Sequence, residues 1–264
     1  MRDKRISVAT TPNGQADAVT KSSDGRVYFV EPAIDKMSME DLLAQLSQHG
    51  NDLGDIHYLQ SQNGNLFSSS SDETQSLSEL SPLTKDVPQE VSWCSEALAQ
   101  KPDAVNIWIG NEKSVTSIHN DPYENIYTVI RGEKHFVVLP PTDSWALKER
   151  YYHHARYERQ SPGSLTIVPS DESVPHVRWS SILNPVVSGA FPDEVHPINI
   201  TLKEGDSLYL PVGWWHYVRQ SGLTIALNWW YDAELRGTSW VLMNFLRNTG
   251  EIPSENKDVD EASY

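Results

Sequence analysis

The stretch VNIWIGNEKSVTSIHNDPYENIYTVIRGEKHFVVL, residues 105–139, decides the fold class of this chain. It contains short runs rich in Val, Ile, Tyr and Trp, and each run ends near Gly, Asn, Asp or Pro. Such runs, separated by turn residues and without a helical period, are typical of β-strands. The stretch therefore predicts a mainly β core, built as a sandwich or a barrel. Strands are expected at residues 105–109, 115–119, 126–130 and 135–139, with Arg131-Gly132-Glu133 as a hairpin turn between the last two.

The same texture continues toward the C-terminus. Further strands are expected at residues 165–168, 198–202, 207–210, 216–219 and 224–230. Residues 141–163 and 170–195 contain helical turns and Pro-rich connections, and we expect them to be insertions at the mouth of the barrel. A helix is predicted over residues 239–247. Its apolar residues lie nearly all round, so it must be buried by the sheet or by another subunit.

The N-terminal part mixes strands with short helices. Strands are expected at residues 6–9, 27–30 and 56–60, and short helices after Ser38 and at residues 93–100. Ser38 is a good N-cap because Asp41 follows three residues later. Residues 61–79 are polar with almost nothing to bury, which predicts a mobile surface loop. The chain is thus divided into supporting strands and helices (1–103), the β core (104–232), and a C-terminal helix with a polar tail (233–264).

Composition excludes several classes of protein. The 264 residues include 21 Lys and Arg against 36 Asp and Glu, a net charge of −15. This charge disfavours nucleic acid, whose binding requires neutralised phosphates, and favours a basic partner. Cys94 is the only cysteine, so internal disulfides and thiolate zinc sites are excluded. No apolar run approaches the roughly 18 residues of a membrane span, and no signal sequence opens the chain. We expect a cytoplasmic protein, with the nucleus also open to it.

His119-Asn120-Asp121 is the most informative tripeptide in the sequence. Residues two apart in a strand point to the same side, so His119 and Asp121 can aim at one point. His216, on a later strand, can supply a second imidazole. Two histidines and one carboxylate on one face of a metal form the site of non-haem Fe(II) oxygenases. Taken singly, each histidine is more simply a hydrogen-bonded structural residue.

Other residues at useful spacings strengthen the metal hypothesis. Lys134 opens the strand that follows the His-Asp pair, and a lysine inside an apolar barrel requires an anion as partner. Thr116 and Tyr127 have hydroxyl groups that can bind the same anion. Thr116 has the opposite strand parity to His119, so its participation requires a twist or bulge. Asn228 is a polar residue in an apolar strand and can bind the anion or orient a ligand.

Three motifs together resemble a known family. They are IHNDPYEN (118–125), RGEKHF (131–136) followed by Pro140-Pro141, and EGDSLYLP (204–211) leading to Trp215-His216. They are similar to the JmjC (cupin-like) 2-oxoglutarate oxygenases, and within that family to its small protein lysyl hydroxylases. The resemblance runs from about Ile6 to Asp232, which is most of the chain.

The resemblance implies a double-stranded β-helix (jelly-roll) with flanking helices. It implies Fe(II) held by His119, Asp121 and His216, which would be the catalytic residues, with 2-oxoglutarate and O₂ as cosubstrates. It also implies that Lys134, Thr116 and Tyr127 grip 2-oxoglutarate and that Asn228 and Asn106 line the pocket. The reaction would proceed through an Fe(IV)=O species, release succinate and CO₂, and hydroxylate a lysine side chain. The implied substrate is a developmentally regulated GTP-binding protein. Trp108, Trp229 and Trp230 would wall the pocket, unless they only fill the core.

Two alternatives stay open. An Nε-methyl-lysine demethylase of the same family uses the same iron chemistry, and the metal motif does not separate the two activities. A non-catalytic cupin-like protein is the other alternative, because members of the family carry a further region before the segment that matches Ile6. We also expect acidic residues near the mouth, Glu124 among them, to receive the ammonium of a substrate lysine. If another subunit covers the C-terminal helix, the chain is a homodimer through that helix.

Overall fold

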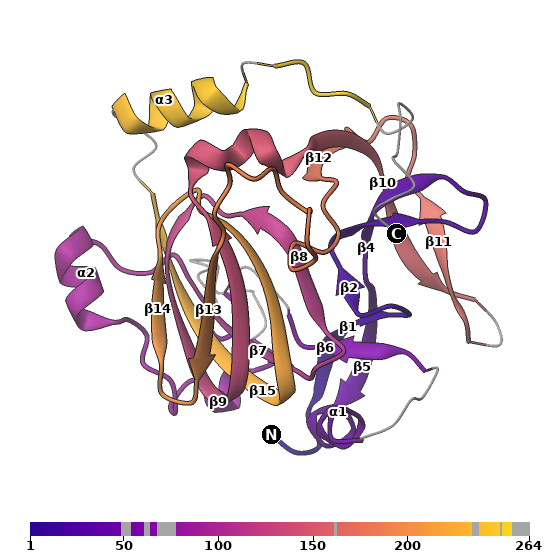
Figure 1. Ribbon diagram of the computed structural model, residues 1–264. Helices are drawn as coiled ribbons and strands as arrows, with labels where there is room; N and C mark the ends of the chain where they lie inside the picture. Colours follow the sequence, from indigo (N-terminus) through magenta and orange to yellow (C-terminus); the bar gives the residue numbers. More distant parts are fainter. Residues whose placement is uncertain are drawn as a thin grey trace.

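The structure is a computed structural model that describes residues 1–48, 54–60, 64–67, 78–160, 163–233, 238–248 and 250–254. Its centre is a pair of long antiparallel strands, β9 (Tyr123–Leu139) and β15 (Trp215–Asp232), which run side by side through the molecule (Figure 1). Aromatic and β-branched residues dominate both strands, as expected of strands that pack on both faces.

The partners of β9 and β15 change along their length. One half of the pair joins β7 (Ala104–Gly110) and β14 (Ser207–Leu210), and the other half joins β8 (Val115–Asn120) and β13 (Ile198–Lys203). The sheet therefore folds into two layers connected by the two bent strands. Buried side chains from both halves form one cluster, which includes Tyr127, Val129, Phe136, Val218 and Ala226. This arrangement confirms the predicted mainly β double-stranded β-helix.

The predicted hairpin at Arg131-Gly132-Glu133 is wrong. Residues 126–130 and 135–139 belong to the single strand β9, and β15 pairs with both segments. Gly132 has φ +78° and marks the bend between the layers. Residues 216–219 and 224–230 likewise belong to the single strand β15, whose pairing shifts register between Ser221 and Ala226. The glycine signals a change of direction, but the chain continues into the other layer instead of turning back.

Two further sheets stand beside this core. The first contains β5 (Ala33–Ser38), β1 (Arg5–Thr11) and β6 (Ile56–Tyr58) in that order. The second has the order β11-β10-β4-β3, and β12 also pairs with β10. Its strands are β3 (Ala18–Lys21), β4 (Val27–Glu31), β10 (Glu149–Arg159), β11 (Leu165–Pro169) and β12 (Val177–Ser180). The two-residue strand β2 (Gln15–Ala16) pairs with β8.

These sheets change the interpretation of residues 141–163 and 170–195. Residues 141–147 do form a helical turn, η2 (Pro141–Leu147). The remainder of the first segment contains β10, whose parallel pairing with β4 joins it to the N-terminal part of the chain. Because this partner lies more than a hundred residues earlier, no local pattern announces the strand. The second segment contains β12, which pairs with β10.

The other helices agree with the sequence. In α1 (Met39–Leu46) the Ser38 hydroxyl accepts a hydrogen bond from the Asp41 N–H at 3.0 Å, as the capping pattern predicts. The helix at 93–100 is α2 (Ser92–Leu98), and the short turn η1 (Ser81–Leu83) precedes it. None of the helices in the described ranges is long and apolar enough to cross a membrane.

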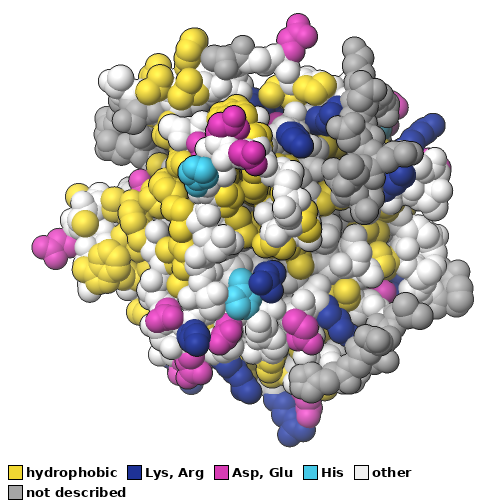
Figure 2. All heavy atoms as spheres, in the orientation of Figure 1, with side chains coloured by type: hydrophobic (Ala, Val, Ile, Leu, Met, Phe, Trp, Pro, Cys, Tyr) yellow, Lys and Arg dark blue, Asp and Glu magenta, His cyan; other side chains and the backbone are white. Residues whose placement is uncertain are grey.

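The C-terminal helix α3 (Thr238–Arg247) lies across η2 rather than on the sheet (Figure 1). Figure 2 shows hydrophobic side chains gathered over this part of the surface. Val241 and Phe245 are 64% and 65% exposed, and Leu242 and Leu246 are also exposed. The sheet therefore does not bury this helix. Of the two expected ways of covering it, only contact with another subunit stays possible.

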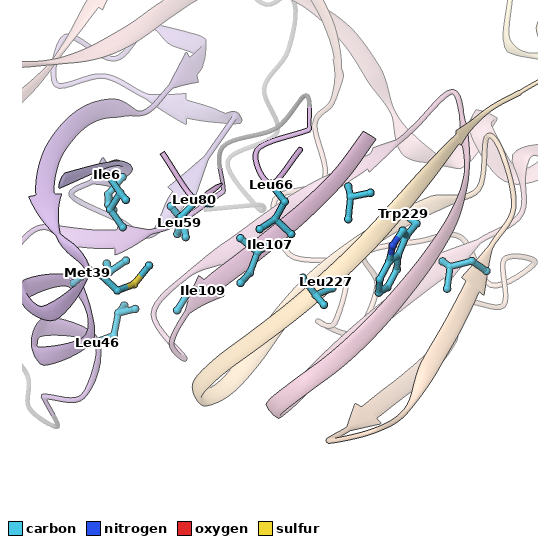
Figure 3. Close-up of a cluster of buried hydrophobic side chains, with 14 of the residues drawn as sticks. Ile6, Met39, Leu46, Leu59, Leu66, Leu80, Ile107, Ile109, Leu227 and Trp229 are labelled. Carbon is cyan, nitrogen blue, oxygen red and sulfur yellow. The ribbon is translucent and has the colours of Figure 1, made fainter. Parts of the chain in front are cut away.

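The largest cluster of buried side chains lies between α1, β1 and the outer face of β7 and β15 (Figure 3). Leu66 belongs to it and is 0% exposed, so the expected loop at residues 61–79 contributes this residue to the core. Leu66 is held there because its N–H donates to the carbonyl oxygen of Val105 at 3.3 Å. Residues 61–63 and 68–77 of the expected loop lie outside the described residues.

Candidate metal centre and cosubstrate pocket

His119, Asp121 and His216 meet at the end of β8 and the start of β15. His119 Nε2 lies 3.6 Å from one oxygen of Asp121, and His216 Nε2 lies 3.6 Å from the other. One ligand atom from each residue falls within 4.8 Å of the others, a spacing that suits a single bound ion. The structure thus brings together the three residues that the sequence singled out, across nearly a hundred residues of chain.

Both imidazole rings are oriented by backbone carbonyls. His119 Nδ1 donates to the Ser117 carbonyl oxygen at 2.8 Å, and His216 Nδ1 donates to that of Trp214 at 3.1 Å. These bonds place the proton on Nδ1 and leave the Nε2 lone pairs directed at the shared point. Burial, and then the neighbouring His119, lower the pKa of His216 to about 4, which keeps it in the neutral form that a metal requires. Two neutral imidazoles and a carboxylate are a donor set that fits Fe(II).

A bulge in β8 explains how Thr116 can face the same side of the strand as His119. His119 pairs with His216, and Thr116 pairs with Val218, so Ser117 and Ile118 of β8 together oppose the single residue Tyr217 of β15. The extra residue rotates Thr116 onto the face that carries His119, and both line the same cavity. The register shift therefore supplies the irregularity that the sequence required for Thr116 to take part.

The triad opens into a cavity of about 760 Å³, a volume typical of small-molecule sites. Its inner wall comes from the β core and from Tyr58 of β6, and its outer wall from the N-terminal part of the chain and from Trp179 of β12. The inner residues include Tyr58, Trp108, Thr116, Tyr127, Phe136, Val218, Asn228 and Trp230, and the outer ones include Asp17, Phe29, Glu31, Ile34, Gln60 and Trp179.

Lys134 lies behind the inner wall, and it is only 2% exposed. Its ammonium donates to the Tyr58 hydroxyl at 3.1 Å, and this hydroxyl also bonds Thr116. Burial lowers the pKa of Lys134 to about 7. No carboxylate in the described part of the chain forms an ion pair with it. A buried ammonium without an acidic partner is the arrangement that favours an anion.

The sequence missed Tyr58, which connects Lys134 to Thr116. Tyr127 lines the cavity as expected, and burial raises its pKa, so its hydroxyl is a neutral donor. Tyr58 comes from β6, a strand far from the core in sequence. A tyrosine at a strand end is the only local signal that could have identified it.

Asn228 and Asn106 are paired in register but differ in their surroundings. Asn228 lines the cavity, where its Oδ1 accepts from the Trp108 indole at 2.8 Å. Asn106 is not among the lining residues, contrary to expectation, because its Oδ1 accepts from the N–H groups of Gly64 at 2.9 Å and Asn65 at 3.2 Å. Asn106 therefore holds the backbone of Gly64 and Asn65 beside β7 instead of lining the cavity.

Of the three tryptophans expected to wall the pocket, two face the cavity and one faces the opposite side of its strand. Trp108 and Trp230 line the cavity. Trp229 points to the opposite face of β15, where it packs beside Leu227 in the buried cluster (Figure 3). Its indole donates to the Pro88 carbonyl oxygen at 3.0 Å, so the prediction that Trp229 walls the pocket is wrong.

The acidic residues at the mouth also differ from the expectation. Glu124 accepts hydrogen bonds from the Tyr209 hydroxyl at 2.7 Å and the Val212 N–H at 3.1 Å, and it does not line the cavity. It braces the segment that leads to His216. Asp17 and Glu31 line the cavity in its place. They belong to N-terminal strands, so only the fold reveals them.

Comparison with known proteins identifies relatives over most of the chain. Residues 1–237 match the family model of the cupin-like domain. The chain is 37% identical over 265 residues to the lysine-specific demethylase JMJ32 of Arabidopsis thaliana, an alignment that covers 94% of this chain and 72% of that protein. It is 36% identical over 231 residues to the bifunctional peptidase and (3S)-lysyl hydroxylase JMJD7 of Homo sapiens, with 87% and 68% covered. The JmjC domain-containing protein E of Dictyostelium discoideum is 29% identical, with 99% and 78% covered.

Proposed function

Because this chain belongs to the JmjC cupin-like domain family, whose members are 2-oxoglutarate oxygenases, we propose that it hydroxylates a lysine side chain of a protein, with Fe(II) as its metal. One observation carries the proposal: the His119, Asp121 and His216 triad opens into a cavity lined by Tyr58, whose hydroxyl accepts a hydrogen bond from the buried ammonium of Lys134 behind the wall. A metal site in the cavity and a buried ammonium behind its wall suit a chelating dicarboxylate.

The residues have separate roles in this proposal. His119, Asp121 and His216 would hold Fe(II) from one side and leave the other side open. When bound, Fe(II) with 2-oxoglutarate and O₂ supplies the oxidation, with one oxygen atom entering the substrate and the other entering succinate as CO₂ leaves. Lys134 would pair with the far carboxylate of 2-oxoglutarate, and the hydroxyls of Thr116, Tyr58 and Tyr127, which line the cavity, would complete its hydrogen bonds.

The cavity wall would exclude water from the reacting atoms. Trp108, Phe136 and Val218 present apolar surface around the triad, and Trp179 stacks on His119 with ring planes 6° apart. In such a dry site each charged hydrogen bond is stronger than it would be in water.

Lysine is proposed as the target because the names of two relatives refer to lysine. JMJD7 is named a (3S)-lysyl hydroxylase and JMJ32 a lysine-specific demethylase. Demethylation of methyl-lysine is therefore the second candidate. A developmentally regulated GTP-binding protein is the partner we propose, and the net charge of −15 supports a basic partner surface.

The proposal is tested in two steps. The first is anaerobic titration with Fe(II) and 2-oxoglutarate, followed by the visible charge-transfer band of the chelate. We expect a band in the wild type, none in Asp121→Ala, and a band in Lys134→Ala only at 2-oxoglutarate concentrations at least tenfold higher. A band that forms equally well without Lys134 contradicts the proposed anion site.

The second step is mass spectrometry of lysine peptides from a developmentally regulated GTP-binding protein, incubated with enzyme, Fe(II), 2-oxoglutarate and O₂. Hydroxylation adds one oxygen atom, whereas demethylation removes a methyl group and releases formaldehyde. Asp121→Ala is the inactive control. Methyl loss from methyl-lysine peptides, with unmethylated peptides unchanged, would replace our proposal by the second candidate.

A further inference from the structure

Asp17 is placed beside the metal site by its backbone. It connects β2 to β3, and β2 pairs with β8 at Thr116. Its carbonyl oxygen accepts from the Ser117 hydroxyl at 2.8 Å, and Ser117 precedes His119 by two residues. Its φ of +54° turns the chain sharply between the two strands. The residue is therefore attached to the strand that carries the first metal ligand.

The carboxylate of Asp17 enters the cavity with little compensation for its charge. Its side-chain hydrogen bond comes from the neutral amide of Gln60, at 2.9 Å. Glu31 lines the same cavity and adds a like charge, although His154 Nε2 lies 3.2 Å from the Glu31 carboxylate. Among the described residues no Lys or Arg forms an ion pair with Asp17. Burial, and then Glu31, raise the pKa of Asp17 to about 6, against the smaller opposing effects of the Gln60 hydrogen bond, His119 and His154.

A cation placed in the outer part of the cavity would complete this arrangement. It would give Asp17 the charged partner that the protein does not provide, and it would relieve the repulsion between Asp17 and Glu31. Apolar side chains lie around the same opening: Phe29, Ile34 and Trp179 line it. A long aliphatic stem that ends in an ammonium group has the matching pattern of apolar and charged parts.

We propose that Asp17, assisted by Glu31, is the specificity residue that receives the unmethylated ε-ammonium of the substrate lysine. The inference rests on the proposed function for the lysine substrate and adds the residue that selects it. An unmethylated ammonium offers three N–H donors to these carboxylates. The neutral Gln60 amide continues to donate its hydrogen bond to Asp17. A trimethylated amine offers none, and aromatic cages rather than carboxylate pairs suit it. The site therefore favours free lysine over trimethyl-lysine.

The test measures binding rather than turnover. The holoprotein, loaded anaerobically with Fe(II) and 2-oxoglutarate, is titrated in a calorimeter with Nα-acetyl-lysine methylamide and with the norleucine compound, which has the same four side-chain carbons but lacks the ammonium. We expect the wild type to prefer the lysine compound by about tenfold or more, and Asp17→Asn to remove that preference. Asp24→Asn is the matched control, because Asp24 undergoes the same substitution on an exposed turn away from the cavity.

One further variant and two further probes complete the test. Glu31→Gln should reduce the preference a few-fold, and it decides the matter if Asp17→Asn does not fold. An unchanged preference in a folded Asp17→Asn, or in Glu31→Gln where the first variant is unfolded, overturns the inference. So does tighter binding of the trimethyl-lysine or the arginine compound than of the lysine compound.

Failure of the inference is separable from failure of the proposed function. If the holoenzyme hydroxylates lysine peptides while Asp17→Asn keeps the ammonium preference, the function stands and the inference fails. If no peptide is hydroxylated while the preference still depends on Asp17, the ammonium receptor stands and the hydroxylase proposal fails.

Discussion

Lys134 shows how a single residue reveals the chemistry of a cavity. An ammonium that is 2% exposed and bonded to a tyrosine hydroxyl is a liability in a folded protein unless a ligand neutralises it. Its pKa of about 7 reflects that burial. In the proposed function, this local loss of stability accompanies the anion site.

This cost should be visible in the pH dependence of unfolding. The pKa of Lys134 is about 7 in the folded protein and 10.5 as an ordinary lysine. Below pH 7 the ammonium is charged in both states and the full burial penalty is present. Between pH 7 and 10.5 the unfolded state binds more protons than the folded state, so this residue's contribution to the free energy of unfolding rises with pH.

We expect Lys134→Met, without 2-oxoglutarate, to be more stable than the wild type by about 1–4 kcal/mol at pH 7, with a smaller gain at pH 9. Urea unfolding at the two pH values measures both differences. Lys203→Met, on the exposed end of β13, is the control, and it should leave the pH dependence unchanged. A Lys134→Met protein that is less stable than the wild type at pH 7 would show that the ammonium has a partner in the folded state.

Residue spacing predicted the metal triad but not the residues that the N-terminal part of the chain contributes to the cavity. His119 and Asp121 are neighbours in one strand, so the sequence alone indicates that they converge. Asp17 follows β2, which pairs with β8, and Tyr58 belongs to β6, which pairs with β1. Because these partner strands are distant in the sequence, residue spacing does not predict that either side chain lines the cavity. Trp229 was misplaced for a different reason: the parity of β15 puts it on the opposite face from Asn228 and Trp230.

At the level of elements, the bend shared by β9 and β15 holds the two layers in place. Gly132 and Gly222 both have positive φ, +78° and +62°, on opposite sides of this bend. A Cβ at Gly132 would lie 2.6 Å from Thr224 Oγ1 and 2.8 Å from the Leu223 carbonyl oxygen, whereas a Cβ at Gly222 would meet nothing within 4 Å. Both glycines adopt a positive φ, but only at Gly132 would an added methyl group clash with neighbouring atoms.

Gly132→Ala should therefore destabilise the protein more than Gly222→Ala. We expect roughly 1–2 kcal/mol for Gly222→Ala from backbone strain alone, and a further loss of about 1–3 kcal/mol for Gly132→Ala from the clash. Chemical denaturation of the two variants measures the difference. Equal losses would mean that the bend can open to admit a methyl group, and that close contact between the strands does not fix it.

The same bend explains what local patterns could and could not predict. Alternating β-branched residues correctly placed nearly every strand of the β core. Arg131-Gly132-Glu133 has the composition of a hairpin turn, yet β15 pairs with both sides of it, and that partner lies about ninety residues later. Likewise β10 follows the helical turn η2 without a change in composition, so its place in a sheet depends on β4.

On the scale of the whole molecule, the site requires both parts of the chain. The β core supplies the triad and Lys134, and the N-terminal sheets supply Asp17, Glu31 and Tyr58. The sequence predicted the β core because its strands are consecutive and strongly patterned. It treated the N-terminal part only as support, because the contribution of that part to the cavity depends on contacts between sheets.

Helix α3 leaves one apolar surface of the molecule uncovered. Arg247 anchors the end of the helix by donating to the Glu149 carboxylate at 2.6 Å, and Arg178 donates to the same carboxylate at 2.7 Å. Glu149 is nearly fully buried, so this attachment fixes how the helix sits over η2. The residues that remain exposed, Val241, Leu242, Phe245 and Leu246, share one face of the helix.

We expect this face to meet its own copy in a homodimer, since a two-fold interface buries the same patch twice. Sedimentation or light scattering should give a dimer for the wild type and a monomer for Val241→Glu combined with Phe245→Glu. These positions are better choices than Trp240, which is partly covered by the molecule itself. Trp93→Ser changes another exposed hydrophobic residue, on α2, and should leave the dimer intact. A monomeric wild type at micromolar concentration would end the dimer hypothesis. The four exposed apolar side chains would then belong to a contact with a different protein or stay uncovered.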